Sequence, residues 1–261
     1  MLSQVGEKEA RDVAEAARER EWRLPSFGRE LFFGRLRLDL IYPLPTPPPG
    51  MAEKGERFLD ALQTFLQNKV DPLQIERDGK IAEDVIGGLK ELGALGIKIP
   101  EEYGGLGLSQ VYYNKALALC GTWHAAVATL LSVHQSVGLS QPLLLFGSAE
   151  QRRAWLPKLA STHLSAFLLT EPDVGSDPAR VTTTAVPTSD GGYVLNGSKL
   201  WATNGTIADV VVVIAVVPKT AGHPGGITAF VVSCDSPGVR VEYRNEFMGL
   251  RGIENSLTTF T

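Results

Sequence analysis

The hydrophobic positions of this 261-residue chain change their period once, near Ser161. Before that point, apolar residues recur three or four positions apart, as in amphipathic helices. The clearest stripe consists of Phe58, Leu59, Leu62, Phe65 and Leu66. After Ser161, apolar residues alternate with polar ones or form continuous β-branched runs, which is typical of strands. The pattern predicts an α+β chain, with an all-α helical domain at 51–161 and a β domain at 162–261, built as a barrel or a sandwich.

The helical half is expected to contain about four to six helices. One helix is predicted near Ile81–Leu92, ending at Gly93. The long, apolar and Ala-rich segment Val111–Leu131 is expected to form a buried helix. Ser148 and Gln151 have the spacing of a capping box, which predicts the start of a further helix.

Three features of the helical half invite a functional interpretation but are expected to be structural. The glycines of segment 104–107 follow no predicted strand and lack the GxGxxG spacing, so they indicate an interhelical turn and not a nucleotide-binding loop. His124 and His134 have no acidic or Cys partner at metal-binding spacing, and we expect hydrogen-bonded core residues. The apolar run Leu143–Phe146 is likewise expected to lie in the core.

Short strands separated by turn-forming residues are expected throughout the β half. The predicted strands are 167–170, 181–186, 193–195, 210–217, 227–232, 239–243 and 257–261. Two turn segments are prominent: Glu171–Asp177, which is rich in Pro, Gly and Asp, and the Asn196-Gly197 dipeptide. Val210–Val217 contains only Val, Ile and Ala, which predicts a strand buried on both faces. We expect a β platform with two loops at which a flat ligand could lie.

Segment 1–50 is charged at its beginning and rich in proline at its end. Residues 1–20 mix acidic and basic side chains in an Ala-rich context, which predicts a solvated helix, with an interaction arm as the alternative. Their many acidic residues argue against a transit peptide. Between Leu40 and Met51, the prolines predict a stiff, extended connector, with a PxxP-type recognition site as the alternative.

Composition narrows the functional classes only slightly. Hydrophobic residues make up 44% and charged residues 21% of the chain, which are globular values. The net charge of −4 argues against a nucleic-acid partner. Two cysteines are too few for a disulfide framework, which favours a reducing compartment. No apolar run has the length of a transmembrane segment, so the cytoplasm is the default location.

Two motifs stand out in the β half. The first motif reads Leu169-Thr170-Glu171-Pro172-x-x-Gly175-Ser176-Asp177. The second reads Leu195-Asn196-Gly197-x-Lys199-x-Trp201-x-Thr203-Asn204-Gly205. Together, in this order, they resemble the acyl-CoA dehydrogenases, a family of flavoproteins, more specifically than either motif alone. The upstream pairs Ser26-Phe27, Phe33-Gly34 and Tyr42-Pro43 are similar to the very-long-chain branch. Phe247–Ile253 matches a further stretch of the family.

The resemblance implies FAD as the cofactor, a fatty acyl-CoA as the substrate and an electron-transfer flavoprotein as the electron acceptor. The residues that it implies for flavin binding are Phe167, Leu169, Thr170, Gly175, Ser176, Trp201, Ala202 and Thr203. Ser176 is also implied to bind the substrate, near the thioester. Trp201 would pack against the flavin ring, and Thr203 would form a hydrogen bond near its N5 atom. Glu171 is expected to fix the turn and not to act as a base.

The same resemblance implies that the β half is a barrel and that the helical half forms one wall of the acyl-chain channel. It also implies a second helical domain after the barrel, which supplies the catalytic glutamate, part of the flavin site and most of the homodimer contact. That C-terminal helical bundle is expected to be absent from this sequence. No residue of the chain is therefore assigned as the catalytic base.

Three functions follow as hypotheses. The first is FAD-dependent α,β-dehydrogenation of a fatty acyl-CoA in fatty acid β-oxidation, by an enzyme of which this chain is an incomplete part. The second is a catalytically silent module that binds flavin or acyl-CoA or serves in assembly. The third is a structural interaction protein that uses the Pro-rich connector and the charged N-terminus. A flavin spectrum combined with a dye-reduction assay separates the three.

Overall fold

The computed structural model describes residues 25–44, 46–220 and 224–261, so the predicted charged helix at 1–20 lies outside the described residues. The chain divides into two compact units, Met1–Pro48 and Pro49–Thr261. The described part of the first unit contains helix α2 (Phe27–Phe32) and a 3-10 turn (Leu38–Leu40). Helix α2 begins after Ser26, whose side chain accepts a hydrogen bond from the Arg29 amide.

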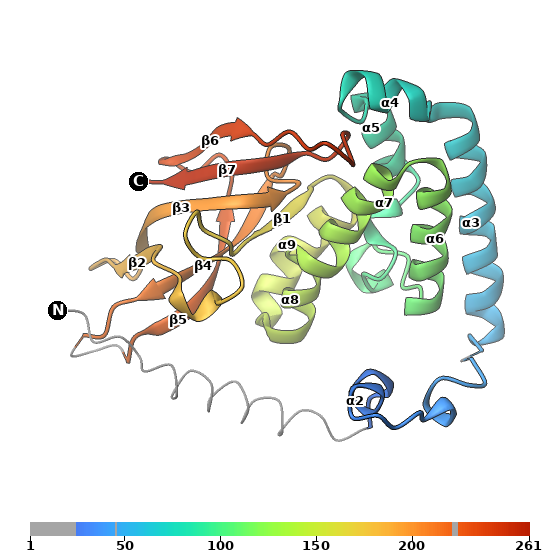
Figure 1. Ribbon diagram of the computed structural model, residues 1–261, viewed down its shortest axis with the longest axis horizontal. Helices are drawn as coiled ribbons and strands as arrows, with labels where there is room; N and C mark the ends of the chain where they lie inside the picture. The colour runs from blue at the N-terminus through green and yellow to red at the C-terminus, as the bar shows by residue number, and fades with distance from the viewer. Residues whose placement is uncertain (1–24, 45, 221–223) are drawn as a thin grey trace. The chain divides into compact units, whose positions relative to one another are not determined.

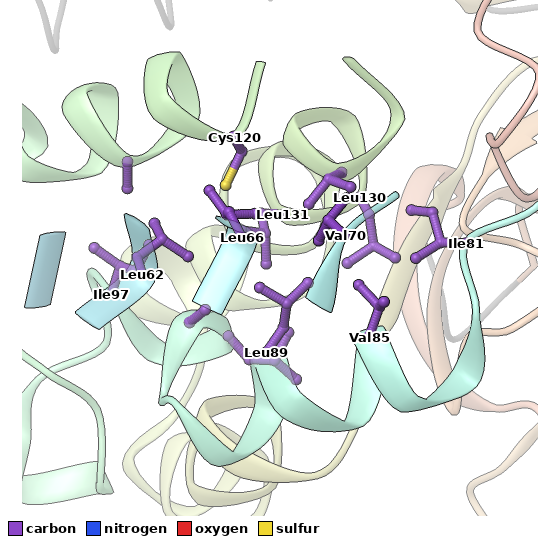
Figure 2. Packing of buried hydrophobic residues seen from close by; sticks show 14 of the residues in the cluster. Leu62, Leu66, Val70, Ile81, Val85, Leu89, Ile97, Cys120, Leu130 and Leu131 are labelled. Atoms are coloured by element: carbon purple, nitrogen blue, oxygen red, sulfur yellow. The ribbon is translucent and has the colours of Figure 1, made fainter. Parts of the chain in front are cut away.

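The helices of the second unit come first along the chain (Figure 1). They are α3 (Pro49–Lys69), α4 (Pro72–Asp78), α5 (Glu83–Glu91), α6 (Gln110–Trp123), α7 (Ala125–Ser132), α8 (Ser140–Phe146) and α9 (Ala149–Ser161). Figure 2 shows the core between α3, α5, α6 and α7, where Leu62, Leu66, Leu89 and Leu131 are all fully buried. Burial of this apolar surface is the main stabilising contribution to the helical half.

Several predicted helices are confirmed. The helix near 81–92 is α5, followed by Gly93 in the left-handed region with φ of 78°. The Ser148–Gln151 capping box is present, with both reciprocal hydrogen bonds made. Helix α3 begins at Pro49, inside the predicted connector, because proline fits the first turn of a helix.

Two predictions for the helical half are wrong. Segment 111–131 is not one helix, because His124 is extended and its Nδ1 atom accepts a hydrogen bond from the Ala126 amide, so that it caps a new helix, α7. The run Leu143–Phe146 is not wholly in the core: Leu143 is buried, but Leu145 is 60% and Phe146 76% exposed. Four consecutive helical residues point all around the helix axis and cannot share one buried face.

The strands of the second unit form one mixed sheet. They are β1 (Ser165–Leu168), β2 (Thr184–Pro187), β3 (Tyr193–Thr203), β4 (Val210–Val217), β5 (Gly226–Ser233), β6 (Val239–Arg244) and β7 (Asn255–Phe260). Their order is β1-β4-β2-β3-β7-β6, with β5 paired to β4. Strand β4 pairs in parallel with β1 and antiparallel with β5, and it is largely buried, as predicted. The predicted fold class, a helical domain followed by a β domain, is confirmed.

The Asn196-Gly197 dipeptide is not the predicted turn. Strand β3 runs through it, with Asn196 paired to Thr184 and Gly197 paired to Phe260. A Cβ atom on Gly197 would lie 2.8 Å from the Thr183 Cα atom, and the φ of Gly197 is 149°. The glycine is therefore required for a close approach of backbones within the sheet and not for a reversal. Strand β2 also begins three residues later than predicted, at Thr184.

The helices and the sheet of the second unit share a core. Leu143 of α8 and Leu156 and Leu159 of α9 pack in one cluster with Val210 and Val212 of β4. Figure 1 shows α8 and α9 beside the sheet, near the start of β1, where the chain leaves α9. This packing fixes β4 and its partner β1, and the first motif begins just after β1 ends.

Candidate functional site

The two motif segments lie side by side where β1 ends. Past Leu168, the Thr170 carbonyl oxygen accepts a hydrogen bond of 2.8 Å from the Leu200 amide of β3. The ammonium group of Lys199 donates to the Leu169 carbonyl oxygen over 3.0 Å. The first motif therefore runs directly beside the stretch of β3 that carries Trp201 and Thr203.

The carboxylate of Glu171 holds the first motif in place from inside the protein. It accepts hydrogen bonds from the backbone amide and the hydroxyl of both Thr182 and Thr183, at 2.6–2.9 Å. A fully buried Lys199 adds an ion pair of 2.8 Å. Burial opposes ionisation of Glu171, but the hydrogen bonds from Lys199 and the two threonines outweigh it and lower the pKa to about 2.

Glu171 is therefore an ionised group whose oxygen atoms are occupied by donors. A general base needs a free lone pair within reach of the proton that it removes. The prediction that Glu171 fixes the turn is confirmed. The turn itself is closed by reciprocal backbone hydrogen bonds between Glu171 and Val174, beyond which Gly175 and Ser176 are exposed.

Trp201 lies at an irregularity of β3 and not in a loop. The register of the β3–β7 pair shifts between Lys199 and Ala202, and Trp201 has a φ of 63°. A left-handed conformation is uncommon for a bulky residue and costs free energy. Trp201 is 53% exposed, and its indole ring lies against Phe247, with 5.8 Å between the ring centroids. The strand irregularity thus turns a flat aromatic face outward.

The remaining predicted site residues occupy both sides of this junction. Phe167 is half-buried in β1 and packs against the core shared by the helices and the sheet. Ala202 is buried, whereas Thr203 is partly exposed and its hydroxyl oxygen accepts a hydrogen bond of 3.1 Å from Asn255. Asn204 has a φ of 66° and donates to the Leu130 carbonyl oxygen over 3.0 Å, which ties this end of β3 to helix α7.

Sequence reasoning missed three polar residues that organise the site. Lys199 belongs to a quoted motif, but lysine is rarely fully buried, and nothing in its neighbours predicted an internal ion pair with Glu171. Asn245 and Asn255 are buried where β6 ends and β7 begins, and asparagine at such positions normally indicates a turn. Only their pairing across the sheet reveals that they form one network with Thr203.

The two histidines singled out in the sequence are structural. His134 is fully buried: its Nε2 atom donates to the Leu159 carbonyl oxygen, and its Nδ1 atom accepts from the Ser165 amide. His124 bonds to Glu76 over 2.9 Å. Among the residues that the structure describes, no cluster of His, Cys, Asp or Glu is arranged to hold a metal ion. Nor does any described helix combine the length and apolar character needed to cross a membrane.

Comparison with known proteins gives matches over most of the chain. The family model "Acyl-CoA dehydrogenase, N-terminal domain" matches residues 52–163, and "Acyl-CoA dehydrogenase, middle domain" matches residues 166–261. A probable acyl-CoA dehydrogenase of Mycobacterium tuberculosis, FadE10, is 54% identical over 98% of this chain. The mouse mitochondrial very long-chain specific acyl-CoA dehydrogenase is 37% identical over 90% of the chain. The chain spans 39% and 37% of the lengths of these two relatives, respectively.

Solved structures give the same result. Butyryl-CoA dehydrogenase from Megasphaera elsdenii superimposes with a TM-score of 0.73 at 33% identity, over 80% of this chain and 56% of that one. An acyl-CoA dehydrogenase from Bacillus anthracis, solved in complex with FAD, gives a TM-score of 0.69 at 32% identity, over 80% of this chain and 35% of that one. Together with the two family models, these matches establish that the chain belongs to the acyl-CoA dehydrogenase family.

Proposed function

We propose that this chain forms the flavin-binding part, and one side of the substrate site, of an enzyme that dehydrogenates a fatty acyl-CoA between its α and β carbons. The observation that carries the proposal is the hydrogen bond between the Leu200 amide and the Thr170 carbonyl oxygen. It holds the two family motifs together, so that Trp201 and Thr203 lie beside the end of β1. In an unrelated sheet protein, nothing would require these two segments to meet.

The residues at this junction fit an isoalloxazine ring. The exposed indole of Trp201 offers a flat apolar face, and the partly exposed Thr203 and Thr170 offer hydroxyl groups to ring heteroatoms. FAD, when bound, would accept a hydride from the substrate. We place segment 167–176 along the flavin, with backbone amides of this segment and the Thr170 hydroxyl at the pyrimidine edge. Ser176 is placed between the flavin phosphate and the thioester of the acyl-CoA.

The catalytic base is proposed to come from a part of the complete enzyme that these 261 residues do not contain. Removal of the α proton needs a carboxylate with a free lone pair. Glu171, the buried carboxylate of the first motif, is occupied by the donors of Thr182, Thr183 and Lys199. An electron-transfer flavoprotein as electron acceptor and a homodimeric assembly belong to the same proposal. The similarity to very long-chain specific enzymes favours a long acyl chain as the substrate.

Purified chain, reconstituted with FAD, tests the proposal through its visible spectrum and through dye reduction with palmitoyl-CoA. We expect a bound-flavin spectrum without turnover. A fusion of this chain to the remaining C-terminal sequence of the M. tuberculosis relative should then reduce the dye. Turnover by the chain alone would contradict the proposal that the catalytic base lies outside these residues. Absence of bound flavin would contradict the proposal that the chain binds FAD. Bound flavin without turnover in the fusion would favour the alternative, a catalytically silent binding module.

A further inference from the structure

Three polar side chains lie in a row across neighbouring strands at the end of β3. Thr203, the last residue of β3, is directly opposite Asn255, the first residue of β7. Asn245 follows β6, and its backbone amide donates to the Asn255 carbonyl oxygen over 2.8 Å. Asn245 and Asn255 are 4% and 2% exposed, so their side-chain amides depend on protein partners.

The hydrogen bonds along this row have one direction. The Asn245 Nδ2 atom donates to Asn255 Oδ1 over 2.7 Å, and Asn255 Nδ2 donates to Thr203 Oγ1 over 3.1 Å. A side-chain amide carries its donor and its acceptor on opposite ends. Because Asn255 uses its oxygen toward Asn245, it presents its NH2 group to Thr203. The Thr203 oxygen is thereby an acceptor in this row.

A hydroxyl group has one proton and two lone pairs, so accepting from Asn255 leaves the Thr203 proton available. Within the described ranges, Asn255 is the hydrogen-bond partner of the Thr203 hydroxyl, and no acceptor for the Thr203 proton is present. The side chain is partly exposed and lies two positions beyond Trp201. The next residue, Asn204, is fixed to helix α7 through the Leu130 carbonyl oxygen. The Thr203 hydroxyl is therefore a donor whose position is set by Asn255 and by the neighbouring Asn204.

We propose that Asn255 and Asn245 are positioning residues that orient the Thr203 hydroxyl as a hydrogen-bond donor to a heteroatom of the flavin ring. This inference rests on the proposed flavin site and adds to it the two residues that set the direction of the bond. In the oxidised ring, the N5 nitrogen has a lone pair that would accept such a bond. The two asparagines touch neither ring nor substrate, and they act only through Thr203.

The direction of the row is testable without flavin, by NMR of the side-chain amides in the chain as it stands. The Asn255 resonances are assigned by their loss in Asn255→Asp. Thr203→Val should shift them upfield and speed their exchange with solvent, because their acceptor is gone, whereas Asn245→Ala should leave them hydrogen-bonded. The opposite result, with a shift only in Asn245→Ala, means that the row runs the other way and overturns the inference.

The consequence for the cofactor is tested by the dissociation constant of FAD. In Asn255→Asp, a carboxylate of nearly the same shape accepts the Thr203 proton, so FAD should bind about 10-fold more weakly, as for the loss of one hydrogen bond. Asn196→Asp adds the same charge to an exposed position of β3 and should leave the constant unchanged. Thr203→Val should weaken binding similarly, and the double variant with Asn255→Asp should be no weaker than Thr203→Val.

The analogue 5-deaza-FAD, which lacks the N5 acceptor, separates positioning from a general structural effect. Wild type and Asn255→Asp should bind this analogue equally, whereas natural FAD should bind more weakly to Asn255→Asp than to wild type. Equal binding of natural FAD by the two proteins would overturn the role of Asn255. Failure of the wild type to bind FAD would instead overturn the proposed function. The amide resonances would still show the direction of the hydrogen bonds between Asn245, Asn255 and Thr203.

Discussion

At the scale of single residues, the most unusual feature is a lysine with no exposed surface. Lys199 is 0% exposed, and its ammonium group bonds to Glu171 and to the Leu169 carbonyl oxygen. Such a pair contributes little net stability relative to an apolar pair, but the loss of one partner leaves a buried charge without its counterion. The pair therefore specifies where the first motif lies against β3.

Replacement of this lysine is expected to be severely destabilising. Lys199→Met should lower the free energy of unfolding by about 3 kcal/mol, because the Glu171 carboxylate remains buried without its ammonium partner. Urea titration followed by circular dichroism measures the change. The matched control is Arg57→Met, which breaks the exposed pair with Glu53 and should leave the unfolding midpoint nearly unchanged. Equal effects of the two substitutions would contradict the role assigned to the buried pair.

A second residue-scale prediction concerns pH. Burial lowers the pKa of His134 to about 4, below its ordinary value of 6.5. Between these values the unfolded chain binds the proton and the folded chain does not, so stability is full above pH 6.5 and falls as the pH decreases. The expected loss from pH 7.5 to pH 5 is about 2 kcal/mol. Glu171, whose ordinary pKa is 4.5 and folded pKa about 2, loses its stabilising effect mainly at lower pH.

Urea unfolding of wild type and His134→Gln at pH 7.5 and pH 5 measures this dependence. The variant is expected to be less stable at pH 7.5 but to lose much less stability on acidification. An equally steep loss in both proteins would assign the dependence to other groups.

At the scale of elements, segment 247–253 joins the sheet to the helices. Arg244 of β6 bonds to Glu254 and to the Ile253 carbonyl oxygen, and Ile253 is buried in the helical core. Gly252 lies against α4 and α7: a Cβ atom there would come within 2.5 Å of Ile75 Cγ2 and 3.0 Å of Ala126 Cβ. The same segment carries Phe247, the ring that supports Trp201.

Gly252→Ala should therefore separate the sheet from the helices locally and lower the free energy of unfolding by about 1–3 kcal/mol. Gly249→Ala is the control, because a Cβ atom at Gly249 meets nothing within 4 Å. Thermal unfolding of the two variants measures the difference. If both variants unfold at the same temperature as the wild type, the junction at Gly252 is not tightly packed.

Sequence periodicity predicted the kinds of elements better than their ends. The change from helical to strand patterning near Ser161 corresponds to the end of α9 at that residue and the start of β1 at Ser165. The break at His124 was missed, because a histidine can cap a helix through its ring nitrogen while looking like one more helical residue. Asn196-Gly197 was read as a turn, because the close approach of Thr183 that requires this glycine is a tertiary contact.

The candidate site could be predicted only where its residues lie within the two motifs. The two motifs carry the residues that reach the surface, such as Trp201 and Thr203, and these were named from the sequence. Asn245 and Asn255 lie outside the motifs, and they meet Thr203 only because β7 pairs with both β3 and β6. Such a network follows from strand register, which local patterning does not determine.

At the scale of the whole molecule, two hydrophobic cores support the strands of the second unit. One core lies among helices α3, α5, α6 and α7, and another joins α8 and α9 to β4. The junction of the two motifs lies where the helical and sheet parts meet, and it is pinned to α7 by Asn204. A rigid support of this kind suits a site that must hold a flat cofactor at a fixed distance from its substrate.

The central claim, that this junction binds a flavin ring, is tested most directly by titrating FAD into the purified chain and into its Trp201→Ala variant. Quenching of flavin fluorescence gives the two dissociation constants. We predict saturable one-to-one binding by the wild type and at least about 10-fold weaker binding by Trp201→Ala, because the exposed indole provides the stacking face. Trp155→Phe, on helix α9, should bind like wild type. Absence of saturable binding, or equal constants for wild type and Trp201→Ala, would contradict the account.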